Sequence, residues 1–195
     1  MQKIPTFKKI IIAVWILFLV FCLGFFLTHR ESFTPEGIVI FLNKFGGWVM
    51  CAYLAVSLLR GFTLIPSTPF VLAGTILFPA ESFWVLAISM TGIIFSSSMI
   101  YYFSEHLGFS EYLEEKHPAK IARIHDRLQK PTGLVFVFLW SFAPFLPTDA
   151  VCYVAGILRM SFIKFILAMA FGELILCSIY IFFYSSLIAW LYPAG

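Results

Sequence analysis

The sequence predicts an all-α protein: a polytopic transmembrane helical bundle with two opposed re-entrant helical hairpins that form an inverted repeat. Three observations predict it: the composition, the long apolar runs, and two apolar stretches broken by prolines. Of 195 residues, 61% are hydrophobic and 12% are charged, whereas soluble domains average about 45–50% and about 25%. No soluble core of this size holds such an excess, so a bilayer is expected to supply the apolar surroundings.

The composition also argues against several other classes of protein. The net charge is only +3, and no basic patch is interleaved with polar residues, so nucleic acid is not an expected partner. The four cysteines lie far apart without the spacing of a zinc site. No Gly-x-Ser-x-Gly or Walker pattern occurs. We therefore expect neither catalysis nor a bound metal or cofactor.

Residues 1–44 are expected to form an N-terminal span and an interfacial helix. Three lysines precede the apolar run Ile10–Leu27, which is long enough to cross a bilayer. No small-residue cleavage site follows, so we interpret the run as a retained span rather than a signal peptide, with a cytoplasmic N-terminus. Thr34 and Pro35 then favour a helix start. One face of that helix is apolar, with Ile38, Phe41, Leu42 and Phe45.

Residues 45–190 are expected to form one membrane domain, with repeat one in 45–103, a charged amphipathic connector in 104–130 and repeat two in 131–190. In repeat one, Gly46–Leu59 is apolar, ends at Arg60, and is interpreted as a second span. The next stretch, 61–79, holds three prolines and no charge. It is too apolar for a surface loop and too rich in proline for a straight helix, which favours a re-entrant hairpin.

The rest of this domain follows the same logic. Ser82–Phe103 is a further span, and 104–130 is either an interfacial helical hairpin broken at Pro118 or a solvated connector. Leu134–Leu158 is again apolar but broken, by Pro144, Pro147 and Asp149. Phe162–Leu191 is the last span, with Gly172 and Glu173 inside it.

The two broken stretches resemble each other. Each has a Pro-x-x-Pro, an Ala-Gly, a large apolar residue four positions after the Gly, and a Phe nine positions after it: Pro66, Pro69, Gly74, Phe78 and Phe83 in the first, and Pro144, Pro147, Gly156, Met160 and Phe165 in the second. Phe is common in this chain, so chance explains part of the match. We interpret the pattern as a duplication, which points to a midplane site between the repeats.

Counting spans from a cytoplasmic N-terminus places the two hairpins on opposite faces and the C-terminus in the cytoplasm. The same count places the connector, with its five Lys and Arg residues, outside. That location runs against the positive-inside rule.

The segment from Ser141 to Phe165, with Pro-x-x-Pro-x-Asp followed by Tyr153-Val-Ala-Gly156, resembles the DedA-like, or SNARE-associated Golgi protein (VTT-domain), superfamily. Gly156, Met160 and Phe165 match the family's Gly-x3-aliphatic-x4-aromatic signature, and the resemblance covers residues 45–190. It implies lipid handling or proton-linked transport, as in scramblases and carriers of phospholipid or polyprenyl phosphate.

One departure from the family pattern concerns a basic residue. The family places an aromatic and then, four residues later, Arg or Lys before Phe-x-Pro. Val137 and Ser141 stand at these places here. Arg60 and Arg159 are the candidates to substitute for the missing charge.

Ionisable groups at membrane depth are functional candidates by default. They are Asp149, Glu173, Arg60 and Arg159. Each has a plain alternative: Asp149 as a helix cap, Glu173 as a packing hydrogen bond, and the arginines as boundary residues. The prolines, Gly74, Tyr153, Gly156, Met160 and Phe165 are expected to shape the hairpins.

Three functions stay open at this point. The first is a transporter or scramblase that moves an anionic lipid between leaflets, the second a proton-coupled transporter of small solutes or ions, and the third a membrane organiser without transport. The expected partners are membrane lipids, protons as coupling ion, and further copies of the chain. The small size favours a prokaryotic plasma membrane.

Overall fold

The computed structural model describes residues 6–63, 65–106, 118–144 and 146–183, and within them every regular element is a helix. The all-α prediction is confirmed for this part of the chain. Helix α1, Thr6–Thr28, is one continuous 23-residue helix that contains the run predicted as the first span. Its half-buried side chains form a single stripe, whereas most of its other described side chains are exposed to the surroundings of the protein.

A short 3₁₀ turn, Arg30–Phe33, leads into α2, Pro35–Asn43. The helix begins as predicted, because the Thr34 hydroxyl accepts a hydrogen bond from the Gly37 N–H at 3.1 Å. One part of its apolar face packs inside the protein and the other part lies on the protein surface. Ile38 and Leu42 are buried in the protein, while Phe41 and Phe45 are exposed.

The second predicted span is wrong. A 3₁₀ turn at Gly46–Trp48 precedes α3, Val49–Arg60, which has 12 residues. At 1.5 Å per residue this helix is about 18 Å long, against about 30 Å for the hydrocarbon core. After a 3₁₀ turn at Gly61–Thr63, α4 follows as a second short helix, Thr68–Leu77. Apolar composition alone did not distinguish one arm of a broken helix pair from a span.

The same order of elements occurs twice. After α3 and α4 comes the long helix α5, Ser82–His106. In the second half, α8, Pro131–Phe142, and α9, Thr148–Ile157, are the short helices. The long helix is α10, Phe162–Ser178, which continues as a π-helical turn, Ile179–Phe183. Within the described residues, Ser82–Glu105 and Phe162–Phe183 are the two segments long and apolar enough to cross a membrane, and Ala13–Thr28 of α1 is a shorter apolar segment.

Part of the connector lies outside the described residues, namely 107–117. The described part holds α7, Pro118–Gln129. Pro118 is the first residue of α7, and the other arm of the predicted hairpin lies outside the described residues. This position suits proline, because the first helical residue needs no backbone N–H.

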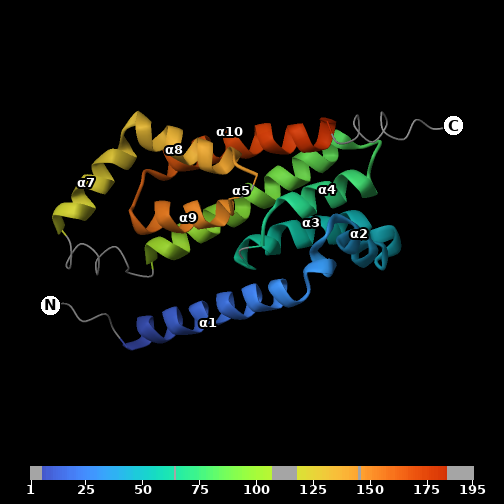
Figure 1. The fold of residues 1–195 in the computed structure, drawn as a ribbon, viewed down its shortest axis with the longest axis horizontal. Coiled ribbons are helices and arrows are strands. Elements are labelled where there is room, and N and C mark those ends of the chain that lie inside the picture. Colours follow the sequence, from blue (N-terminus) through green and yellow to red (C-terminus); the bar gives the residue numbers. More distant parts are fainter. Residues whose placement is uncertain (1–5, 64, 107–117, 145, 184–195) are drawn as a thin grey trace.

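The two pairs of short helices run from opposite ends of the molecule (Figure 1). The start of α1, helix α7 and the connection from α9 to α10 lie at one end of the long axis, and α2 and the connection from α4 to α5 lie at the other. The turn between α3 and α4 and the turn between α8 and α9 both point towards the middle. This arrangement brings the two proline-rich breaks close to each other.

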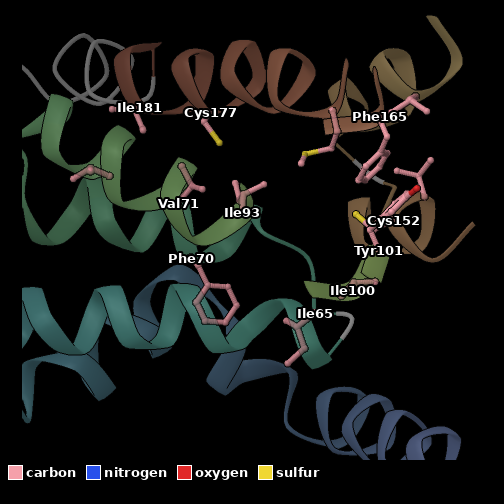
Figure 2. Packing of buried hydrophobic residues seen from close by; sticks show 14 of the residues in the cluster. Ile65, Phe70, Val71, Ile93, Ile100, Tyr101, Cys152, Phe165, Cys177 and Ile181 are labelled. Carbon is pink, nitrogen blue, oxygen red and sulfur yellow. The ribbon is translucent and has the colours of Figure 1, made fainter. Parts of the chain in front are cut away.

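Small residues bring these helices close together. Gly92 of α5 lies against Ser57 of α3, and Gly172 of α10 lies against Ser141 of α8. The residues of the family signature pack at the end of α9. Met160 and Phe165 are fully buried, and the Tyr101 ring of α5 stacks on Phe165 with ring centroids 5.3 Å apart (Figure 2).

Gly156 provides a direct test of this packing. A Cβ at Gly156 would overlap the Ser104 hydroxyl and the Tyr101 backbone carbonyl of α5. We expect Gly156→Ala to lower the free energy of unfolding by about 1–3 kcal/mol, as overpacking does. Unfolding in detergent, followed by circular dichroism, measures it.

Gly24→Ala is the matched control, because a Cβ there meets nothing within 4 Å and alanine favours a helix. Equal stability of the Gly156→Ala protein and the wild type would contradict the close approach of α9 and α5.

Candidate functional site

A buried ion pair joins the two halves of the protein. Arg60 is the last residue of α3 and Asp149 is the second residue of α9. The Arg60 Nη1 and the Asp149 Oδ2 lie 3.8 Å apart, and the two side chains are 5% and 3% exposed. The same Nη1 donates a hydrogen bond to the Ile65 carbonyl at 3.0 Å. Arg60 therefore binds the backbone of its own break and the carboxylate that follows the other break.

Glu173 completes the cluster from a third helix, α10. It is fully buried, and its Oε1 accepts a hydrogen bond from the Thr148 hydroxyl. Its Oε2 lies 3.9 Å from the Cys177 Sγ. Glu173 interacts electrostatically with Arg60 and Asp149. Three of the four predicted ionisable candidates thus gather where the two breaks meet; we call Arg60, Asp149 and Glu173 the charged cluster.

The charged cluster holds one cation and two carboxyl groups. With both carboxyl groups ionised its net charge is −1, and an uncompensated charge away from water is costly. One bound proton makes the cluster neutral. Its composition therefore suits a site that exchanges a proton or accepts the charge of a ligand.

Asp149 does not act as the cap of α9. The residue before the helix is Pro147, and no side chain caps this end. Asp149 lies in the first turn, where a negative charge also interacts favourably with the helix dipole. Its carboxylate is directed at Arg60 instead of at the backbone N–H groups of its own helix.

Arg159, the fourth candidate, is not part of the charged cluster. It is exposed at the opposite end of α9 from Asp149 and has a φ of 49°. The Met160 N–H donates to the Ala155 carbonyl at 2.9 Å, and the Arg159 N–H donates to the Gly156 carbonyl. This is a helix-ending motif that usually has glycine in the left-handed position. Arg159 is thus a residue at the boundary of a helix, which is the alternative to a functional role.

The four prolines lie at the two breaks. Pro66 stands in the first break and Pro69 in the first turn of α4, while Pro144 stands in the second break and Pro147 directly precedes α9. The Trp140 indole N–H donates to the Pro147 carbonyl at 3.2 Å. Side chains thus bind a backbone carbonyl in each break: Arg60 binds that of Ile65, and Trp140 binds that of Pro147.

Ser141 stands where the family has a basic residue. Its side chain is fully buried, and its hydroxyl has no hydrogen-bond partner among the described residues. It lies against Gly172, the neighbour of Glu173. The cation near Glu173 therefore comes from Arg60 in the other half, and not from position 141.

A small cavity, lined by apolar as well as hydroxyl-bearing residues, adjoins Arg60 between α3, α4 and α5. Its volume is about 10 Å³, which is near the size that holds one water molecule. Tyr53, Ser57, Ser67 and Ser89 contribute hydroxyl groups to its lining, and the Tyr53 and Ser89 oxygens are 2.8 Å apart. Arg60 is thus the residue of the charged cluster that borders this cavity in the first half.

Sequence reasoning missed Thr148 and these hydroxyl residues. Thr148 is next to Asp149 in the chain, but its partner Glu173 is 25 residues away. Tyr53 and Ser89 are 36 residues apart on different helices. No spacing within one segment reveals such pairs, because they depend on how the helices pack.

A family model of the VTT domain matches residues 65–186, which is more than half of the chain. The chain belongs to the VTT-domain family. It is therefore a membrane protein of the DedA type. Comparisons with curated proteins and with solved structures return no match. The matched VTT domain contains Asp149 and Glu173, whereas Arg60 precedes it by five residues.

Removing the charges of the cluster tests whether the ion pair of Arg60 and Asp149 couples α3 to α9. Arg60→Leu leaves two carboxyl groups buried without their cation, and we expect a loss of about 3–5 kcal/mol in the free energy of unfolding. The double variant Arg60→Leu/Asp149→Leu removes both partners and should be more stable than Arg60→Leu alone. Unfolding in detergent measures both.

Arg127→Leu is the control, since this side chain is exposed on α7. A double variant that is less stable than Arg60→Leu alone would show that the ion pair does not couple α3 to α9.

Proposed function

We propose that this VTT-domain protein is a transporter or scramblase that moves an anionic lipid, carrying a phosphate or polyprenyl-phosphate group, between leaflets, and that it is not an enzyme. In this proposal α3–α4 and α8–α9 are two opposed re-entrant hairpins of an inverted repeat. The observation that carries it is the charged cluster, buried where the two proline breaks meet. A passive anchor needs neither the breaks nor the buried charges.

The proposed chemistry follows from the three charged groups. The Arg60 guanidinium, 3.8 Å from Asp149, is the group that pairs with a lipid phosphate, since guanidinium and phosphate form strong charge-assisted hydrogen bonds. The phosphate then replaces Asp149 as the partner of Arg60. A proton bound by Asp149 removes the repulsion between the displaced carboxylate and the phosphate. Lipid movement and proton exchange are coupled in this scheme.

When α3 is counted as half of a hairpin and not as a span, the chain has a different orientation in the membrane. With a cytoplasmic N-terminus, α1 crosses the membrane to the outside, and the pair α3–α4 enters the membrane from the outside and returns there. Helix α5 then crosses back to the cytoplasm. The pair α8–α9 enters from the cytoplasmic side and returns there, and α10 crosses to the outside. Ten of the 13 Lys and Arg residues then lie on the cytoplasmic side, in 1–9, 104–130 and 159–164, while Arg30 and Lys44 lie outside. This agrees with the positive-inside rule. We place the protein in a prokaryotic plasma membrane, with the end of α10 outside.

Cysteine labelling tests this orientation. In intact cells, a membrane-impermeant maleimide should label a cysteine at Lys44 and should leave a cysteine at Arg127 unlabelled until the membrane is opened. Both side chains are exposed. Cys22 and Cys51 are replaced by serine for this experiment, because they are the less buried native cysteines. Labelling of position 127 in intact cells would overturn the orientation.

Lipid transfer in liposomes tests the proposed activity. Purified protein should move a fluorescent anionic phospholipid between leaflets, and Asp149→Asn or Glu173→Gln should slow transfer about tenfold or more, since each change weakens a charged contact. Glu36→Gln, at an exposed site on α2, should transfer at the wild-type rate. Wild-type transfer equal to that of empty liposomes, across several lipids with and without a pH gradient, would exclude the proposal.

The same liposomes distinguish the second candidate, a proton-coupled transporter of small solutes. The two carboxyl groups that share one cation favour it. In that case a pH gradient should drive solute flux that an uncoupler and Asp149→Asn both abolish, while lipid transfer stays at the background rate. A stable complex with a partner protein, without transport of either kind, would favour a membrane organiser instead.

A further inference from the structure

The N-terminal helix α1 lies outside the matched VTT domain, yet it contacts the helix that carries Asp149. Its stripe towards the bundle consists of Ile11, Trp15, Leu19, Cys22 and Phe26, and all five are only half-buried. Towards the C-terminal end of α1, Phe26 packs on Phe33 with ring centroids 5.3 Å apart. A helix held by one half-buried stripe is attached weakly.

Helix α1 also contacts the 3₁₀ turn Gly61–Thr63, and it makes one polar contact within this apolar stripe. The Trp15 indole N–H donates to the Tyr153 hydroxyl of α9 at 2.9 Å. The Trp15 ring also packs on Phe103 of α5 with ring centroids 4.6 Å apart. In lipid an indole N–H has no water to bind, so this hydrogen bond holds α1 against α9.

Tyr153 connects this attachment to the charged cluster. It stands four residues after Asp149 on α9, so the two side chains lie on the same side of the helix. Tyr153 also interacts electrostatically with Asp149. Trp15 therefore covers the flank of α9 that carries Tyr153, about one helical turn from Asp149.

We propose that α1 is a lateral latch, closed by Trp15, that controls access from the bilayer to the charged cluster. Trp15 is a positioning residue: it fixes the Tyr153 hydroxyl and holds α1 across this flank of α9. When the hydrogen bond breaks, α1 swings away from α9 about its attachment at Phe26 and Phe33. The ligand that this opening admits is a membrane lipid, and this part rests on the proposed function.

A distance measurement tests the latch without any reference to transport. Spin labels are attached to cysteines at Leu17 and Val154, which are 70% and 45% exposed. Cys22 and Cys51 are changed to serine, and the buried Cys152 and Cys177 are kept. The distance distribution should broaden towards longer distances in Trp15→Phe and in Tyr153→Phe. Unchanged distributions in both variants would overturn the proposal.

Lipid transfer is then measured on the same variants. Trp15→Phe and Tyr153→Phe should each raise the transfer rate about three- to tenfold, the effect expected from the loss of one hydrogen bond between helices in a bilayer. The double variant should equal either single variant, because both changes remove the same bond. Trp84→Phe, at a 64% exposed position on α5, is the control and should match the wild type.

The outcomes separate the two proposals. If the wild type transfers lipid, unchanged or slower transfer in the single variants, or additive effects in the double variant, overturns the latch. Broadened distances together with no transfer by the wild type leave the latch standing and exclude the lipid transport proposed above.

Discussion

The contact on which the rest of this structure depends is the buried pair of Arg60 and Asp149. A guanidinium removed from water is costly unless a carboxylate and further acceptors surround it. Arg60 has both, the Asp149 carboxylate and the Ile65 carbonyl. Because these partners belong to different halves of the chain, the pair requires that the end of α3 and the start of α9 meet. The two breaks make this contact possible, because Arg60 lies directly before one of them and Asp149 directly after the other.

Close packing of the helices brings the end of α3 and the start of α9 together. Both halves of the chain pack through a contact between a glycine and a serine. In the first half a glycine of the long helix, Gly92, lies against Ser57 of the short helix, and in the second half Gly172 lies against Ser141. This correspondence supports the duplication independently of the proline pattern. The two serines differ in their surroundings. Ser57 lines the cavity beside Arg60, whereas the buried Ser141 hydroxyl has no hydrogen-bond partner among the described residues.

The charged cluster is asymmetric although the fold repeats. Its cation comes from the first half and both of its carboxyl groups come from the second. Neither half is therefore neutral or complete alone, and a rearrangement that separates the halves exposes an unpaired charge. Such a separation becomes less costly when a proton neutralises a carboxyl group or a phosphate pairs with the arginine. This link between charge and the relative position of the halves is the physical basis of the proposed transport.

The sequence by itself determined the helical class, the start of α2 at Thr34 and Pro35, the positions of both breaks, and the ionisable residues worth attention. These features depend on local chemistry: apolar runs, proline, and a capping hydroxyl. It did not distinguish a span from half of a broken pair, because the apolar run that ends at Arg60 is compatible with both. In the topology proposed above, this difference also reverses the orientation of everything after α3. Only the tertiary structure decided that Arg60 meets Asp149 and that Glu173 accepts a hydrogen bond from Thr148, while Arg159 lies apart. Contacts between residues 89 and 25 positions apart depend on helix packing and leave no mark in the spacing of any one segment.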